Sequence, residues 1–238
     1  MKSPTINGEE WLEIEETAST QNVAAQILRD GTSYGVVYAH QQVGGRGRFN
    51  RVWLSQKGDS LTFSLIFRSY ADHPKPYLVG MSAALAAAGV LHCQLRWPND
   101  LTFGELKLGG ILTELLPDQD GRLVPVVGIG INLNQTSFLP EIAEIATSMA
   151  MSRGGTYDPE MIAHKIIQRL ASLPEPTSWS VIQPIWNLFD HTPGKKYRLA
   201  SGETAVALGI GSDGQLMCSV DGESQAILAA EALFGTSS

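Results

Sequence analysis

The chain has 238 residues, of which 43% are hydrophobic, and its 17 Lys and Arg against 24 Asp and Glu give a formal net charge of -7. This length can bury one sizeable core with a small second domain, and the acidic balance argues against a general nucleic-acid binder, whose affinity depends on neutralising phosphates. The only cysteines, Cys93 and Cys218, have no CxxC or Cys/His spacing, so we expect neither disulfides nor a zinc site, and a reducing cytoplasm fits best.

Neither the N-terminus nor the most apolar run predicts export or membrane insertion. The first residues lead into glutamates rather than into a basic start and an apolar segment, so no secretory signal is expected. Residues 77–91 are the most apolar, but they fall short of the roughly 20 residues that a membrane span requires. We predict a buried helix here and no membrane partner.

A short strand and a helix are the first predicted elements. Residues 11–16 place apolar side chains among glutamates, which fits a short strand. Ser19 and Thr20 then precede an apolar pattern at helical spacing that ends at Gly31, so we expect one of the two hydroxyls to cap this helix. A hydroxyl beside free N–H groups can also hold a ligand, although a cap alone is the commoner case.

The next two predicted strands flank an unusual loop. Residues 35–39 are apolar and β-branched, and residues 60–67 alternate polar and apolar side chains, as a half-buried strand does. Residues 42–53 lie between them and contain three glycines and three arginines. The loop therefore joins two strands of one sheet.

The loop of residues 42–53 has the composition of an anion-binding segment. Its glycines lose much conformational freedom on folding, so we expect it to stay mobile until a ligand binds. Its N–H groups and the guanidinium groups of Arg46 and Arg48 could then hold phosphate or carboxylate oxygens. A solvated basic loop, or a patch that contacts RNA, explains the same residues without this role.

Polar residues follow the predicted helix of residues 77–91. Residues 93–97 form a strand, and Asn99 and Asp100 end it in a turn that places an amide and a carboxylate at a sheet edge. Most turns of this kind are only turns. Asp100 is either such a structural residue or part of a site.

A hairpin is predicted after this turn. Residues 106–115 form a strand in which Lys107 is followed by two glycines that allow a ligand to approach the backbone. An Asp-Gly turn joins it to an antiparallel partner at residues 124–131. Asn132 and Asn134 come next, and since residues two apart on a strand face the same side, both amides are expected to face one site.

The C-terminal part changes from helices to short strands. Asp158 is expected to cap a helix that buries Met161 and the isoleucines after it, and a second helix is expected over residues 178–189. From about residue 191, short apolar runs are separated by Ser-Gly and Asp-Gly turns. This spacing predicts a small antiparallel barrel of the SH3-like kind.

Four ordered motifs together closely resemble those of biotin protein ligases, whose pattern is GRGRxGRxW, KWPNDL, KxGGIL and GIGxNxN. In this chain they read Gly45-Arg46-Gly47-Arg48 with Arg51 and Trp53, Arg96-Trp97-Pro98-Asn99-Asp100-Leu101, Lys107-Leu108-Gly109-Gly110-Ile111-Leu112, and Gly128-Ile129-Gly130-Ile131-Asn132-Leu133-Asn134.

The resemblance implies a fold and a domain division. The expected class is α+β, with a mixed sheet backed by helices, as in class II synthetase-like catalytic domains, and a small C-terminal SH3-like β-barrel. It implies a biotin- and ATP-binding catalytic domain over residues 1–189 and the barrel over residues 190–238. It also implies a short form without the N-terminal DNA-binding domain that some relatives carry.

The resemblance assigns roles residue by residue. It implies biotin contacts from Ser19, Thr20, Gln21, Gln42, Arg46, Gly47, Arg48, Lys107 and Gly110. It implies ATP contacts from Arg46, Arg48, Trp53, Lys107 and Asn132, with Trp53 on the adenine and Arg46 near the carboxylate and α-phosphate. Catalysis is assigned to Lys107, Arg46 and Asp100, the last as a group that orients the acceptor amine or receives its proton. The sequence names no metal ligands.

Four positions depart from the family pattern. Ala18 stands where an acid is common, and Arg96 replaces a lysine. Gln21 stands where Asn is usual and has a longer arm with the same donor and acceptor. Asn50 replaces a third loop glycine, and asparagine tolerates a left-handed backbone better than most residues.

The resemblance implies an ATP-dependent ligase that uses ATP, biotin and Mg²⁺ to form biotinyl-5'-AMP and transfers biotin to a lysine of a biotin carboxyl carrier protein. The expected carrier is a subunit of acetyl-CoA carboxylase, the location cytoplasmic, and the assembly a monomer or a homodimer without nucleic acid. Two alternatives stay open: a lipoate or octanoate ligase or transferase of the same fold, and a non-catalytic protein that binds biotinyl-adenylate.

Overall fold

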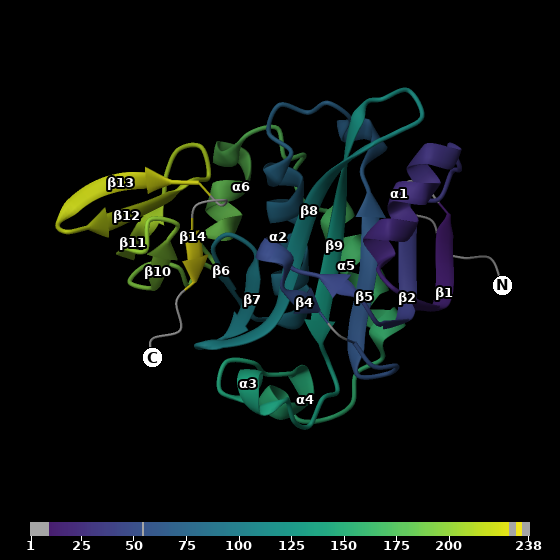
Figure 1. The fold of residues 1–238 in the computed structure, drawn as a ribbon, viewed down its shortest axis with the longest axis horizontal. Helices are drawn as coiled ribbons and strands as arrows, with labels where there is room; N and C mark the ends of the chain where they lie inside the picture. Colours follow the sequence, from purple (N-terminus) through teal and green to yellow (C-terminus); the bar gives the residue numbers. More distant parts are fainter. Residues whose placement is uncertain (1–9, 54, 229–231, 235–238) are drawn as a thin grey trace.

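The computed structural model of the chain describes residues 10–53, 55–228 and 232–234 and is built around a seven-stranded mixed sheet (Figure 1). β1 pairs with β2 in parallel, and the other neighbours are antiparallel. In spatial order the strands are β1 (Trp11–Thr17), β2 (Val36–Gln42), β5 (Ser60–Ile66), β9 (Leu123–Asn132), β8 (Leu106–Pro117), β7 (Asp100–Phe103) and β6 (Gln94–Arg96). The predicted mixed sheet is confirmed.

Helices cover both faces of this sheet. α1 (Thr20–Asp30) packs on Val37, whereas α2 (Tyr77–Leu91) and α5 (Pro159–Ala171) share a core with the alternate residue, Val36. Since neighbouring strand residues face opposite sides, α1 lies on the other face from α2 and α5. α2 is apolar all round because α5 and α6 (Trp179–Trp186) pack against it as well as the sheet.

Two expectations about burial were wrong. β5 is buried along its whole length rather than on one side, because α1 covers one of its faces and α5 the other, and its polar side chains find partners. Thr62 donates to the Ala39 carbonyl, for example. Met161 is 52% exposed, because a helix turns about 100° per residue and the buried face of α5 begins one position later, at Ile162.

A second, five-stranded antiparallel sheet occupies the C-terminal part. Its order is β13 (Glu223–Ile227), β12 (Leu216–Val220), β11 (Thr204–Ile210), β10 (Lys196–Leu199) and β14 (Ala232–Phe234). We call it the C-terminal sheet. It lies beside α6 and β6, at the opposite end of the main sheet from β1 (Figure 1). A small antiparallel C-terminal sheet is thus confirmed, whereas a domain boundary at residues 189 and 190 stays a prediction.

The remaining elements are short. The loop of residues 42–53 contains a hairpin of two short strands and one 3-10 turn. A second 3-10 turn follows β5, and two short helices connect β9 to α5. These elements are β3 (Gly45–Arg46), η1 (Arg48–Asn50), β4 (Val52–Trp53), η2 (Arg68–Tyr70), α3 (Pro140–Ala143) and α4 (Met149–Arg153). Over the described ranges, no helix is long and apolar enough to cross a membrane.

Candidate active site

A cavity of about 940 Å³ lies against the central strands β8 and β9 of the main sheet, near the residue at which β2 ends. Every residue to which the resemblance assigns a role in the site lines it, although these residues come from five separate stretches of the chain. They are Ser19, Thr20, Gln21, Gln42, Arg46, Gly47, Arg48, Trp53, Asp100, Lys107, Gly110 and Asn132. The sequence motifs therefore converge in space, while the role of each residue stays a prediction.

The parallel pair β1 and β2 brings the start of α1 to Gln42. Thr17 pairs with Gln42 at the shared edge, so the residues after β1 lie beside the end of β2. The Thr20 N–H donates to Gln42 Oε1 at 2.9 Å, and the Thr20 hydroxyl is 2.8 Å from the Ser64 hydroxyl. Ser19 holds the N-cap position, but its side chain makes no capping hydrogen bond. The expected hydroxyl cap was wrong, because the Gln42 amide oxygen satisfies a free N–H of the helix start.

Two glycines of β9 make room for two predicted ligand-binding side chains. A Cβ on Gly128 would lie 2.6 Å from Nε2 of Gln21, and a Cβ on Gly130 would lie 2.7 Å from Cε2 of Trp53. Gln21 Nε2 donates to the Leu112 carbonyl at 3.0 Å. Its Oε1 and the Trp53 Nε1 are buried without a hydrogen-bond partner among the described residues. Gln21 thus offers the cavity an open acceptor, and Trp53 offers it an open donor.

The glycine-arginine loop folds into a hairpin over the cavity. Gly45 pairs with Trp53, and the Gly47 N–H donates to the Arg51 carbonyl at 2.7 Å. Only glycine fits at position 45, where a Cβ would lie 2.5 Å from the Trp53 carbonyl oxygen. Phe49, within this hairpin, has a left-handed backbone conformation, with a φ of 56°. The expected mobility of this loop before ligand binding stays a prediction.

The two arginines of the hairpin have different partners. Arg46 donates to Asn22 Oδ1 at 2.7 Å and pairs with Glu114 Oε2 at 3.2 Å, so protein groups hold its guanidinium. Arg48 lies over the Phe49 ring at 4.8 Å from its centroid and is 3.5 Å from Asn99 Oδ1. Burial lowers the pKa of Arg48, while nearby Asp100 opposes the change. An arginine remains cationic under such a shift.

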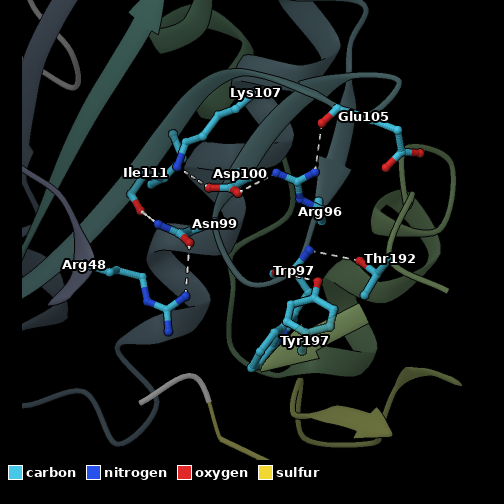
Figure 2. Close-up of polar contacts among 10 residues, drawn as sticks. All are labelled: Arg48, Arg96, Trp97, Asn99, Asp100, Glu105, Lys107, Ile111, Thr192 and Tyr197. Carbon is cyan, nitrogen blue, oxygen red and sulfur yellow. Dashed lines mark hydrogen bonds and ion pairs between the residues drawn. The ribbon is translucent and has the colours of Figure 1, made fainter. Parts of the chain in front are cut away.

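Asp100 lies between two cations, as Figure 2 shows. Its Oδ1 is 2.5 Å from Lys107 Nζ, and its Oδ2 is 3.0 Å from a guanidinium nitrogen of Arg96. Burial raises the pKa of Asp100, but the charges of Lys107 and Arg96 outweigh it and bring the pKa below the ordinary value. A carboxylate held in this way is a weak base that fixes the position of Lys107.

Arg96 had no predicted site role beyond its departure from the family lysine. It is buried and also donates to the Glu105 carbonyl at 3.3 Å. β6 and β7 form a hairpin in which Arg96 pairs with Asp100, so the two side chains are cross-strand neighbours. Opposite charges four residues apart on either side of a turn were the signal for this pair.

The two asparagines after β9 do not share the cavity. Asn132 lines it and donates to the Thr147 carbonyl at 3.0 Å. Asn134 instead bonds Tyr157, with its Oδ1 accepting the Tyr157 N–H at 2.8 Å. The expectation of a shared site was wrong because β9 ends at Asn132 and strand alternation ends with it.

A further part of the cavity lining was missed. Residues 135–142, which lead from the end of β9 into α3, all border the cavity. Leu139 is 63% exposed there and Ile142 is 41% exposed. The sequence carried no signal for this lining, because the exposure of these apolar side chains and the return of this segment to the site appear only in the fold.

Comparison with known proteins agrees with this geometry. Residues 14–134 match the biotin/lipoate A/B protein ligase family. The bifunctional ligase/repressor BirA of Bacillus spizizenii is 33% identical over 171 residues, which are 68% of this chain and 53% of that protein. The biotin--[acetyl-CoA-carboxylase] ligase of Mycobacterium tuberculosis is 27% identical over 179 residues, 68% of this chain and 64% of that protein. The matches thus span between 53% and 64% of these relatives.

Solved structures extend the similarity to nearly the whole chain. The biotin protein ligase from Aquifex aeolicus in complex with biotin and ATP is 26% identical, with a TM-score of 0.74 over 94% of this chain and 97% of that chain. The fold, the cavity and the motif-bearing residues 14–134 lead to one conclusion. The chain belongs to the biotin/lipoate A/B protein ligase family.

Proposed function

We propose that the protein is a biotin–protein ligase, which converts biotin and ATP to biotinyl-5'-AMP and transfers biotin to a lysine of a biotin carboxyl carrier protein. The observation that carries this proposal is the open Gln21 Oε1 in a cavity that Lys107 also lines. An open acceptor suits the N–H of a ureido ring, and a cation suits a carboxylate at the other end of the same molecule.

The acceptor at Gln21 favours biotin over lipoate. A buried acceptor without a partner costs free energy, which a ligand N–H recovers on binding. The ring of lipoate carries no N–H and leaves Gln21 unsatisfied. Ile111, Leu112 and Ile129 also line the cavity and suit the apolar part of biotin.

Charge explains how the first step becomes feasible. A biotin carboxylate oxygen bonds to the α-phosphorus of ATP as the bond from that phosphorus to the bridging oxygen breaks, and pyrophosphate leaves. Both reactants are anions. Lys107, Arg46 and Arg48 line the cavity and supply positive charge near them, and removing one such preorganised group typically costs about 10²- to 10³-fold in rate.

The second step uses a neutral acceptor amine. Its nitrogen attacks the activated carbonyl carbon, AMP leaves, and the nitrogen loses a proton to water. Asp100 is held as a carboxylate by Lys107 and Arg96, so its contribution is to orient the amine by accepting an N–H hydrogen bond rather than to remove its proton. Trp53 provides an aromatic surface for adenine.

Magnesium fits this cavity as a partner of the nucleotide. Among the residues that the structure describes, no group of three or more His, Cys, Asp or Glu could hold a metal. Mg²⁺ in nucleotide sites binds mainly phosphate oxygens with one or two carboxylates. Asp100 also lines the cavity but is paired with Lys107 and Arg96, so Asp59 or Glu141 would hold the ion, which would screen the charge of the triphosphate.

The carrier, the location and the assembly follow from the same proposal. We assign the carrier to a carboxyl-carrier subunit of acetyl-CoA carboxylase and the reaction to the cytoplasm. The choice between monomer and homodimer stays open.

Pyrophosphate release tests the proposal. The protein is incubated with ATP, Mg²⁺ and either biotin or lipoate, with and without a biotin carrier domain. Biotin-dependent release with labelling of the carrier is expected, and Lys107→Ala should abolish turnover without unfolding. Lipoate-dependent release would support the lipoate enzyme, and biotin binding without turnover would support a sensor.

A further inference from the structure

C-terminal residues hold every hydrogen-bonding group of Trp97, which begins the turn of residues 97–100. The Trp97 N–H donates to the Thr192 hydroxyl at 2.9 Å, and its indole N–H donates to the Gly214 carbonyl at 2.9 Å. Its carbonyl accepts from the Tyr197 hydroxyl at 2.7 Å. Tyr197 belongs to β10, and Gly214 lies between β11 and β12.

The three hydrogen bonds to Trp97 are buried. Trp97 is 3% exposed and Tyr197 is fully buried, and their rings meet edge to face at 6.0 Å. Burial raises the pKa of the Tyr197 phenol, so the hydroxyl keeps its proton and donates. Buried hydrogen bonds without competing water fix the backbone they contact.

The held turn carries two groups of the candidate site. Asn99 exchanges two hydrogen bonds with Ile111, through its carbonyl at 2.9 Å and its side-chain amide at 2.6 Å, and Asp100 pairs with Lys107 (Figure 2). The turn therefore has one anchor on β8, at Ile111, and another on the C-terminal sheet, through Trp97.

We propose that Tyr197 and Thr192 are positioning residues for the ligase reaction, which hold the turn of residues 97–100 so that Asp100 and Lys107 stay aligned with the substrate. The rate consequence rests on the proposed function; the positioning itself does not. The C-terminal sheet thus acts on the chemistry through Trp97. A misplacement of about 1 Å at a reacting centre can cost 10²-fold in rate.

The experiment compares Tyr197→Phe and Thr192→Val with Tyr77→Phe. The first two variants keep the side-chain shape and remove one bond to Trp97. The matched control also removes a tyrosine hydroxyl, which donates across the same interface to the Asp213 carbonyl at 2.6 Å but does not contact the turn. Melting temperatures are recorded for all three, and KM and kcat for biotin and ATP.

The first readout needs no activity. Amide hydrogen exchange of Ile111, whose N–H donates to the Asn99 carbonyl, is measured in the ligand-free protein. We expect faster exchange in Tyr197→Phe and Thr192→Val at a temperature where all variants are folded, and unchanged exchange in Tyr77→Phe. Unchanged exchange in the two turn variants would overturn the positioning, because the Ile111 anchor alone would then hold the turn.

The second readout is kinetic. We expect kcat to fall at least about tenfold in both turn variants with KM for biotin and ATP unchanged. A rise in KM alone, or an equal kcat loss in Tyr77→Phe, would show a general packing effect and refute the inference. If the wild-type chain releases no pyrophosphate with biotin, the proposed function fails, while the exchange measurement still decides the positioning.

Discussion

Arg46 pairs with Glu114 across the edge of the cavity, with 3.2 Å between nitrogen and oxygen. The resemblance assigns Arg46 to the carboxylate and α-phosphate of the ligand, and we expect its guanidinium to exchange Glu114 for a ligand oxygen on binding. The side chains are 38% and 29% exposed, and an ion pair with this exposure contributes about 1 kcal/mol or less.

Glu114→Gln should therefore tighten ligand binding. The substitution removes the competing charge, and we expect the affinity for biotinyl-adenylate to rise by at most about fivefold. Titration calorimetry measures this. The control is Asp120→Asn, which weakens a surface pair with Arg122 at 3.3 Å in the distant turn between β8 and β9. Weaker binding in Glu114→Gln would mean that Glu114 supports the ligand-bound loop.

Gly128→Ala and Gly130→Ala should separate the two halves of the cavity. A Cβ at 128 pushes Gln21, and a Cβ at 130 pushes the ring of Trp53. We expect KM for biotin to rise at least about tenfold in the first variant and KM for ATP in the second. Neither glycine has a positive φ, so backbone strain does not explain a loss. Each variant is the control for the other, and equal effects on both substrates would contradict the division.

These glycines also show which features could be predicted from the sequence and which could not. Elements with strong periodicity, such as α1 and the hairpin of β8 and β9, were predictable because their patterns are local. The motif residues were predictable as a set because a family resemblance carries them. The packing of Trp53 on Gly130 was not predictable, because it depends on the loop folding back over a strand that lies far along the chain.

Contacts between elements explain the other misses. Asp100 reads as a turn residue, and only the pairing of β6 with β7 brings the Arg96 charge to it. Tyr197 reads as an ordinary apolar strand residue, and its bond to the Trp97 carbonyl spans 100 positions. The first contact had only the opposite charges four residues apart as a local signal, and the second exists only once the two sheets are packed.

Asp100→Asn should destabilise the protein in a pH-dependent way. The folded-state pKa of Asp100 lies below the ordinary 3.8, so the charged group contributes stability above that value and loses it as the pH falls through the folded pKa. We expect a loss of roughly 3 kcal/mol near neutral pH, where the variant leaves Arg96 and Lys107 without their counter-charge. Urea unfolding measures it. A difference from wild type that stays constant as the pH falls through the folded pKa of Asp100, where its carboxylate becomes neutral, would argue against the ion pairs as its cause.

Arg96 substitutions test the same carboxylate from the other side. Arg96 contacts both Asp100 and the Glu105 carbonyl, and lysine has one compact charge in place of a planar fork. Arg96→Lys should leave Asp100 ionised and retain most of the activity. Arg96→Met removes one of the two cations that lower the pKa of Asp100, so burial raises that pKa. The acid limb of the pH–rate profile for carrier labelling should therefore move to higher pH in Arg96→Met and stay in place in Arg96→Lys. Identical profiles in the two variants would show that Lys107 alone keeps Asp100 ionised.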